Sequence, residues 1–244
     1  MAVDALRGAL GFLTRLPVGR DERAWEAFRE SPAAFPIAGY VVGALLSVPF
    51  LLPLPGPSTA FAFVSVVYLV TGVNHADGVA DLGDAAVVHG DREKRRAVMR
   101  DTTVGVGALL ALGIVLAGLA LAGVALAGLP LAAAAGIVLA AEVGAKFAVA
   151  LLIRLGELAH EGLGSQFVGQ ESGTLLAPLA AAVPAALISV PALAAVCGAT
   201  LSGALLGRWA HYRLGGISGD VLGATNELGR VLALHAGVIA WTLW

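Results

Sequence analysis

Four long stretches of the chain contain no Asp, Glu, Lys or Arg, namely 31–76, 102–141, 172–207 and 231–244. A membrane-spanning helix needs about 20 predominantly apolar residues to cross about 30 Å of hydrocarbon. Each of the first three stretches is long enough for two crossings and the turn between them. The pattern therefore predicts paired membrane helices separated by short charged segments.

Proline and glycine lie inside each long stretch, where a turn is needed: at 49–57, at 128–130 and at 184–191. Such residues interrupt helices. We expect three helical hairpins, formed by Ala34–Leu52 with Ser58–Val73, Val104–Ala127 with Leu131–Ile153, and Leu175–Val190 with Ala192–Ala210. A seventh segment, Val221–Trp244, either spans the membrane or lies partly in its interface. The predicted fold class is an all-α, polytopic integral membrane protein with about six to seven transmembrane helices, forming one domain over residues 1–244.

Each hairpin returns the chain to the side that it left, so the charged segments share one face. These segments are the N-terminal segment 1–33 and the loops at about 74–103, 154–173 and 211–230. Every Lys and Arg except Lys146 lies in or next to them. Because basic residues are enriched in cytoplasmic loops, we expect a multi-pass protein of the cell membrane with its polar chemistry facing the cytoplasm.

Composition agrees with this interpretation. Of the 244 residues, 58% are hydrophobic and 13% are charged. An ordinary soluble domain has about 45–50% apolar and about 25% charged residues, so a soluble globular enzyme is excluded. The formal net charge of −2 gives no basic surface for nucleic acid, and no nucleic-acid partner is expected.

The most informative polar stretch runs from Asn74 to Asp84. Asp77, Asp81 and Asp84 are spaced i, i+4 and i+7, which places three carboxylates on one face of a helix. Like charges at this spacing destabilise a helix unless a cation neutralises them. Mg²⁺ is the natural candidate, because it binds one or two carboxylates, waters and substrate phosphates. The alternative, a solvated acidic helix end, stays open at this point.

A basic cluster follows the aspartates. Five of the fifteen Lys and Arg residues lie within 92–100. They are either a topology signal or a clamp for a diphosphate, since phosphoryl transfer depends on neutralising phosphate charge. Acidic residues for a metal beside basic residues for phosphate are the combination that a polyphosphate substrate requires.

Glu142 and Lys146 are the only charged residues in the middle of a predicted span. They are either an ion pair that tethers neighbouring helices or residues that line the site, because ionisable groups inside a membrane are costly and often functional. The small-residue pairs Gly39/Gly43 and Gly203/Gly207 predict close helix packing.

The sequence resembles the cobalamin synthase, or adenosylcobinamide-GDP ribazoletransferase, family. The motifs that carry the resemblance occur in family order over essentially the whole chain: Phe12–Val18, Phe35–Gly39, His75–Asp84, Val98–Asp101 with Gly105–Gly107, Glu161–Gly164 and Gly216–Ala224. Two positions depart from the family pattern, because Lys146 and His160 stand where the family usually has Arg. Either change could weaken a bidentate phosphate contact.

The resemblance implies a polytopic membrane enzyme of the last stage of cobalamin assembly. It implies that adenosylcobinamide-GDP is joined to α-ribazole, or to its 5′-phosphate, with release of GMP and with Mg²⁺ as cofactor. A homo-oligomer stays an open alternative. Lipid is the other expected partner.

On this resemblance we expect Asp77, Asp81 and Asp84 to hold Mg²⁺ against the diphosphate. Asp101 is expected to be a further ligand or the base that takes the hydroxyl proton, and Asp84 is the second residue expected to act in catalysis. The residues expected to contact substrate are Arg15, His75, Arg95, Arg100, Glu161, Asp220 and Glu227.

Two other functions remain as alternatives at the level of sequence. A CDP-alcohol phosphotransferase also uses Asp-Gly and spaced aspartates, but its motif expects Ala-Arg where this chain has Ala80-Asp81. A cation-coupled transporter would use Glu142 and Lys146 midway across the membrane, although the one-sided distribution of charge disfavours it.

Overall fold

The computed structural model describes residues 2–19, 21–159, 166–167 and 175–244. Within them the secondary structure is helical: α1 Ala2–Leu13, α2 Glu22–Arg29, α3 Ala34–Leu46, η1 Val48–Leu51, α4 Gly56–Thr71, α5 Asn74–Val87, α6 Arg92–Met99, α7 Val106–Ala127, α8 Leu131–Leu155, α9 Leu176–Ala186, α10 Val190–Leu214 and α11 Gly219–Leu243. The only β-type pairing in the described part is a single bridge between Leu158 and Ile217. The predicted all-α class is confirmed.

By length and composition, four segments of the described chain can span a membrane: Ala34–Leu51, Val106–Ala127, Leu131–Leu155 and Val190–Leu214. The pair α4 and α5 raises the number to five if it counts as one broken span, and α9 is a shorter apolar helix of 11 residues. The polytopic prediction holds, but the structure has fewer candidate spans than the six to seven expected.

The second predicted span ends in a sharp bend. The chain bends by 99° between α4 and α5. Gly72 at the junction has a φ of 72°, a conformation that favours glycine because it lacks a Cβ atom. After the bend, α5 carries three aspartates. We therefore treat α5, like α6, as lying outside the membrane-spanning segments.

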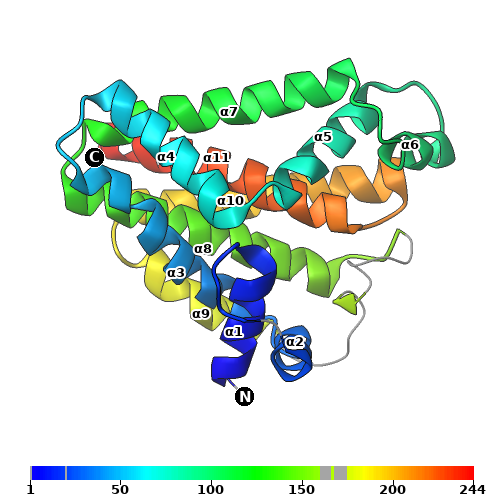
Figure 1. Ribbon diagram of the computed structural model, residues 1–244, viewed down its shortest axis with the longest axis horizontal. Coiled ribbons are helices and arrows are strands. Elements are labelled where there is room, and N and C mark those ends of the chain that lie inside the picture. The colour runs from blue at the N-terminus through cyan, green and yellow to red at the C-terminus, as the bar shows by residue number, and fades with distance from the viewer. Residues whose placement is uncertain (1, 20, 160–165, 168–174) are drawn as a thin grey trace.

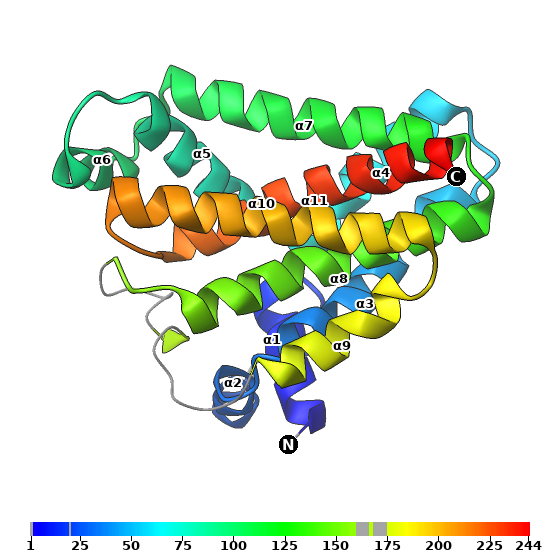
Figure 2. The same cartoon turned by 180° about the vertical axis from the view of Figure 1, so that it is seen from behind.

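Helix α8 is the central element of the bundle. It packs against α3, α9, α10 and α11, and Figures 1 and 2 show it between these helices in both views. Most of its residues are buried. A Cβ atom at either Gly39 or Gly43 of α3 would lie 2.7 Å from the α8 backbone, so the predicted close helix packing at this pair is confirmed.

Helix α7 lies at the periphery, with large apolar side chains exposed along it. Leu109, Leu110, Ile114 and Leu121 are each at least 60% exposed. An apolar surface of this kind suits contact with lipid tails better than contact with water. Helix α7 packs on α4 and α5 and therefore covers the outer side of the helix that carries the aspartates.

The connections sort by charge to opposite ends of the molecule (Figure 1). The connections 47–55, 128–130 and 187–189 and the C-terminus lie at one end, on the left of the view. The basic helix α6 and the α10–α11 connection lie at the other end. The basic α6 and the α10–α11 connection thus lie together as predicted, whereas α1 and α2 of the charged N-terminal segment lie below the middle of the bundle in this view.

One predicted loop is corrected by the structure. The segment 211–230 was expected to be a loop, but α10 continues to Leu214 and α11 begins at Gly219. Glu227 and Arg230 therefore lie inside a helix, where they are fully buried. Ser218 begins α11 by accepting a hydrogen bond from the Val221 amide through its side chain, a common helix N-cap.

Helices α1 and α2 form a small helical hairpin against the bundle (Figure 1). They pack closely, since a Cβ atom on Gly8 would lie 2.2 Å from the Ala24 carbonyl oxygen. Asp21 caps α2 by accepting from the Ala24 amide. This hairpin forms one wall of a large cavity.

Candidate active site

A cavity of about 940 Å³ lies between the α1–α2 hairpin and the bundle. Such a volume suits a large organic ligand, since ligand pockets are typically about 300–1,000 Å³. One part of its wall is polar and comes from the start of α5 and the start of α11. The polar side chains there are Asn74, His75, Asp77, Ser218, Asp220 and Asn226. Aromatic side chains line another part.

Two glycines bring the polar ends of α5 and α11 together. A Cβ atom on Gly78 would lie 2.5 Å from the carbonyl oxygen of Asp220, and one on Gly223 would lie 3.2 Å from the Cα atom of His75. Any larger residue would push the two helices apart. This packing places Asp77 and Asp81 beside Asp220, although Asp220 is distant from both in the sequence.

The pKa of Asp81 reflects this crowding of carboxylates. Burial, followed by the charges of Asp220, Asp77 and Asp84, raises the pKa of Asp81 to about 6. Burial and nearby like charges both disfavour an ionised carboxylate. A cation among these groups would relieve the repulsion, which fits the predicted metal site.

Asp84 has a different environment from the other two aspartates of α5. Its carboxylate accepts hydrogen bonds from the amides of Gly105, at 2.8 Å, and Ala108, at 2.9 Å. These amides belong to the start of α7, which has no partner for them within the helix. Asp84 thus caps α7 from a neighbouring helix, and its predicted roles in metal binding and catalysis stay predictions without geometric support.

A buried ion network lies directly behind the polar wall. Lys146 Nζ donates to Glu142 Oε2 at 2.6 Å and to Asn226 Oδ1 at 3.3 Å. Arg230 donates to Glu142 through Nε and to Glu227 Oε1 through Nη1, the latter at 2.6 Å. Two carboxylates thus face two cations, and all four side chains are at most 1% exposed. The network joins α8 to α11.

This network decides between the two interpretations of Glu142 and Lys146. They form an ion pair that tethers neighbouring helices, because Arg230 joins them from α11. Neither residue lines the cavity. Glu227, which was expected to contact substrate, belongs to this network and is likewise absent from the cavity wall.

The network also orients His75 through Asn226. Because Lys146 can only donate, Asn226 Oδ1 faces it and Asn226 Nδ2 lies 3.1 Å from His75 Nδ1. With Nδ2 as the donor, His75 Nδ1 accepts, so the ring carries its proton on Nε2. Burial is the main cause that lowers the pKa of His75 to about 4, which agrees with a neutral ring. His75 can therefore donate one hydrogen bond from Nε2.

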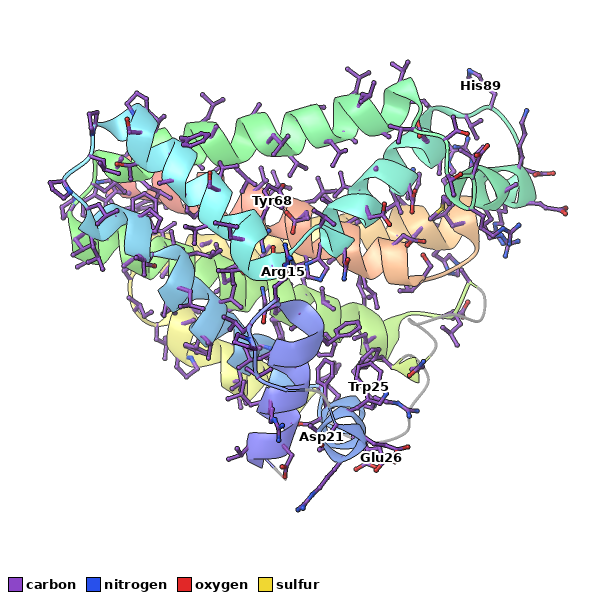
Figure 3. The ribbon with its side chains drawn as sticks, viewed as in Figure 1. Arg15, Asp21, Trp25, Glu26, Tyr68 and His89 are labelled. Atoms are coloured by element: carbon purple, nitrogen blue, oxygen red, sulfur yellow. The ribbon has the colours of Figure 1, made fainter. Side chains whose placement is uncertain are left out.

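The predicted basic residues have separate positions. Arg95 is buried and donates through Nη1 to the carbonyl oxygens of Ala85 and Ala86, so it binds the end of α5. Arg100 is exposed at the end of α6. Arg15 is exposed and follows α1 near the α4–α5 junction, as Figure 3 shows. None of the three lines the cavity.

Asp101 lies in the connection between α6 and α7 and is exposed. Its Oδ1 accepts from the amide of Thr103 at 3.0 Å and from the Thr103 hydroxyl at 2.8 Å. These hydrogen bonds lower the pKa of Asp101, which makes the carboxylate a weaker base. Its predicted role as general base stays a prediction. Glu161, the remaining predicted contact, lies outside the described residues.

Mg²⁺ at this wall would need oxygen ligands from the substrate as well as from the protein. Among the described residues, no group of three His, Cys, Asp or Glu side chains is arranged to hold a metal ion by itself. Mg²⁺, however, often takes only one or two protein carboxylates and completes its shell with water and substrate phosphates. Asp77 lies on the cavity wall, and Asp81, one helical turn along α5, lies beside Asp77 and Asp220 but does not line the cavity. The two carboxylates fit that donor set.

Sequence reasoning missed several residues of the cavity wall. Among the polar ones, Ser218 precedes Asp220 within the Gly216–Ala224 motif, and Asn226 follows just after that motif. Nothing in their spacing distinguishes them from ordinary turn residues. The others belong to the α1–α2 hairpin and include Arg7, Asp21, Glu22 and Trp25. The dense charges of the N-terminal segment were the only available signal.

Fold and cavity together define a polytopic helical membrane protein with an acidic, partly aromatic ligand site. The family model for cobalamin-5-phosphate synthase matches residues 5–238. The chain belongs to this family, which confirms the resemblance identified from the motifs. No solved structure matches the chain significantly.

Curated relatives match over nearly their full length. The chain is 56% identical to a Halorubrum lacusprofundi protein, over 99% of both chains, and 41% identical to a Haloquadratum walsbyi protein, over 100% of both. It is 34% identical to a Methanocella arvoryzae protein over 99% of this chain and 97% of the relative. All three relatives are named adenosylcobinamide-GDP ribazoletransferase.

Proposed function

We propose that this protein is an adenosylcobinamide-GDP ribazoletransferase. It joins adenosylcobinamide-GDP to α-ribazole, or to its 5′-phosphate, and releases GMP. Family membership and full-length similarity to proteins of that name support this activity. The structural observation that carries the proposal is the convergence of His75, Asp77 and Asp220 on one wall of a large cavity.

The reaction is a phosphoryl transfer. A ribose hydroxyl of the acceptor attacks the phosphorus that is bonded to cobinamide. A new P–O bond forms there, the P–O bond to the GMP portion breaks, and the hydroxyl proton passes to a base. Such reactions depend mainly on positioning and on neutralising charge.

Asp77 and Asp81 are the residues that would hold Mg²⁺, with Asp220 beside them. Bound Mg²⁺ supplies positive charge to the diphosphate and helps to place it. Asp220 takes the place predicted for Asp84, because Asp84 is engaged in capping α7. The acidic wall by itself repels a diphosphate, so metal dependence is an expected property of the reaction.

His75 acts on the substrate as a hydrogen-bond donor. Its Nδ1 atom faces Asn226, and its Nε2–H is the group left for a phosphate oxygen. The imidazole is held neutral by its surroundings, so it donates a hydrogen bond without adding a full charge. Asn226, Lys146 and the rest of the buried network position this ring.

We further propose that the site faces the cytoplasm of a cell-membrane protein. The basic helix α6 lies at the same end of the molecule as the start of α11 (Figure 1). Basic residues are enriched on the cytoplasmic side of membrane proteins. This orientation gives the enzyme direct access to soluble substrates.

The alternatives have weaker support. Family membership favours a ribazoletransferase over a CDP-alcohol phosphotransferase. For a transporter, the charged residues midway along α8 would need to be available to an ion. Glu142 and Lys146 are instead paired with each other and with groups of α11.

The test is to incubate membranes containing the protein with adenosylcobinamide-GDP, α-ribazole and Mg²⁺ and to measure cobalamin and GMP. We expect both products, and we expect EDTA to abolish them. Asp77→Asn and Asp81→Asn should each lower the rate by on the order of 100-fold or more. Glu93→Gln, on the exposed side of α6, is the matched control and should leave the rate unchanged.

Two outcomes are decisive. The activity is wrong if correctly inserted wild-type protein forms neither product under these conditions. The metal assignment alone is wrong if both aspartate variants release GMP at the rate of the Glu93→Gln protein.

A further inference from the structure

One part of the cavity wall, on and next to the α1–α2 hairpin, is aromatic. Phe12 and Trp25 of the α1–α2 hairpin line it together with Phe35 and Phe167. Their rings pack on one another, with centroids 5.5 Å apart for Phe12 and Trp25 and 5.4 Å apart for Trp25 and Phe167. The cavity therefore offers a rigid aromatic surface as well as a polar one.

The rings of this cluster differ in exposure. Phe28, Phe35 and Phe167 are at most 4% exposed and form its packed interior. Phe12 is 36% exposed, and Trp25 is half-buried. Packing explains the interior rings, whereas Phe12 and Trp25 keep surface that no other described residue covers. A flat apolar ligand group would cover them.

An exposed carboxylate lines the same cavity as this aromatic surface. Glu22 lines the cavity, and within the described residues its side chain makes no hydrogen bond or ion pair. Its neighbour Asp21 is already engaged, since it accepts from the Ala24 amide at 2.8 Å and pairs with Arg7 at 2.9 Å. Of the two carboxylates that the described part of α2 and its cap place at the cavity, Glu22 is thus the one free to accept.

Glu22 and Trp25, three residues apart on α2, both line the cavity. Figure 3 shows Trp25 on the side of α2 that faces the bundle, whereas Glu26 points away from it. Glu26 does not line the cavity. The same helix therefore presents one acidic residue to the cavity and another to the surroundings.

We propose that Trp25 and Glu22 form the subsite for the guanine base of the nucleotide that leaves. The guanine stacks on Trp25 and Phe12, and its N1–H and 2-amino group donate to the Glu22 carboxylate. Base stacking on aromatic side chains is a strong, general contact. A carboxylate matches the donor edge of guanine, as it matches amino groups of bases in other complexes.

This inference rests on the proposed function, which supplies two aromatic ligands, guanine and the benzimidazole of α-ribazole. The benzimidazole ring of a ribazole has no N–H group to offer, so it leaves Glu22 unpartnered. Guanine satisfies both the ring surface and the carboxylate. The geometry therefore favours the nucleotide leaving group at the α1–α2 hairpin.

The test measures binding of GMP to the purified full-length protein in detergent with Mg²⁺, by calorimetry and by tryptophan fluorescence. We expect GMP to bind and to quench fluorescence. Glu22→Gln should weaken GMP binding by about tenfold, whereas the control Glu26→Gln should bind as the wild type does. AMP, which has no N1–H group, should bind weakly to the wild type and equally to Glu22→Gln.

A second variant tests the stacking surface. Trp25→Phe retains an aromatic ring and should still bind GMP, but the GMP-dependent quenching should disappear because the remaining tryptophans, such as Trp209, do not line the cavity. Trp25→Leu should weaken GMP binding by about tenfold. The aromatic core below it, Phe28 and Phe35, is left intact in both variants.

The subsite is refuted if Glu22→Gln and Trp25→Leu bind GMP as tightly as the Glu26→Gln control. It is also refuted if these variants lose affinity for α-ribazole while their GMP affinity is unchanged, because the hairpin would then hold the acceptor base. Both results leave cobalamin formation by the wild type intact. Failure of the proposed function instead appears as the absence of product from wild-type protein.

Discussion

A Cβ atom added to Gly78 would lie 2.5 Å from the carbonyl oxygen of Asp220. This contact between α5 and α11 sets the separation of Asp77 and Asp81 from Asp220. It also explains why glycine follows Asp77. Only glycine lets the Asp220 backbone pack this closely against α5, and Asp77 lies directly next to this contact.

Gly78→Ala should therefore impair both stability and catalysis. The extra methyl group meets backbone, which cannot rotate away, and overpacking of this kind costs about 1–3 kcal/mol. A displacement of about 1 Å in a catalytic group can cost on the order of 100-fold in rate. Thermal unfolding in detergent and the rate of GMP release measure the two effects.

The matched control is Gly113→Ala on α7, where a Cβ atom would meet nothing within 4 Å. Alanine is preferred to glycine in a helix by about 1 kcal/mol, so this variant should be at least as stable as the wild type. Equal behaviour of the two alanine variants would show that the α5–α11 contact does not constrain the site.

Asp84 and Asp220 should respond differently to removal of charge. Asp84→Asn keeps an acceptor for one of the two α7 amides and should retain most of the activity, whereas Asp84→Ala should lose about 1 kcal/mol of stability with the cap. Asp220→Asn should lower the rate of GMP release far more than Asp84→Asn. The reverse order in the same assay would restore Asp84 to the metal site.

Arg230 should be essential to folding because it neutralises two buried carboxylates. Arg230→Met leaves Glu142 and Glu227 with only Lys146, and removal of one partner from a buried ion pair costs about 3–5 kcal/mol. The amount of folded protein and its Tm in detergent measure this loss. The double variant Arg230→Met, Glu227→Gln removes one charge of each sign.

We expect that double variant to recover part of the lost stability, because the remaining Glu142 and Lys146 still form a pair. No recovery would indicate that the shape of Arg230, and not the balance of charge, holds α8 to α11. The comparison separates packing from electrostatics within the same network.

Asp81 should make stability without metal depend on pH. Its pKa is raised to about 6, with burial as the main cause and the charges of Asp220, Asp77 and Asp84 adding to it. A carboxylate with a raised pKa in the folded state favours folding while it is protonated. Its contribution is therefore fully present below about pH 3.8 and is lost as the pH rises through about 6.

In EDTA, the Tm should consequently fall between pH 5 and pH 7, on top of the change caused by other groups. Asp81→Asn should reduce this fall, and added Mg²⁺ should raise the Tm more at pH 7 than at pH 5. The assignment fails if Asp81→Asn shows the same difference in Tm between the two pH values as the wild type.

The positions of most long helices could be predicted from the sequence. The expected spans Val104–Ala127 and Leu131–Ile153 differ from α7 and α8 by no more than two residues at either end. The reason is that exclusion of charge from lipid acts on each segment separately. The prediction failed at α9, which ends at Ala186 with Pro184 inside it and is too short to span alone.

The site could be predicted only in part, as Asp77, Asp84 and Asp220 illustrate. Helical spacing placed Asp77, Asp81 and Asp84 on one face of a helix. It carried no information about which neighbouring helix meets each carboxylate. Asp84 meets the amides of α7, whereas Asp77 and Asp81 meet α11 and Asp220.

The sequence by itself therefore determined the helical membrane class, the sidedness of charge and the family. Tertiary structure alone decided that Glu227 and Arg230 belong to a buried network, that Asn226 orients His75, and that α2 lines the cavity. Hydropathy and helical period describe one segment at a time. Contacts between helices depend on close packing at glycines such as Gly78 and Gly223, which only the assembled fold reveals.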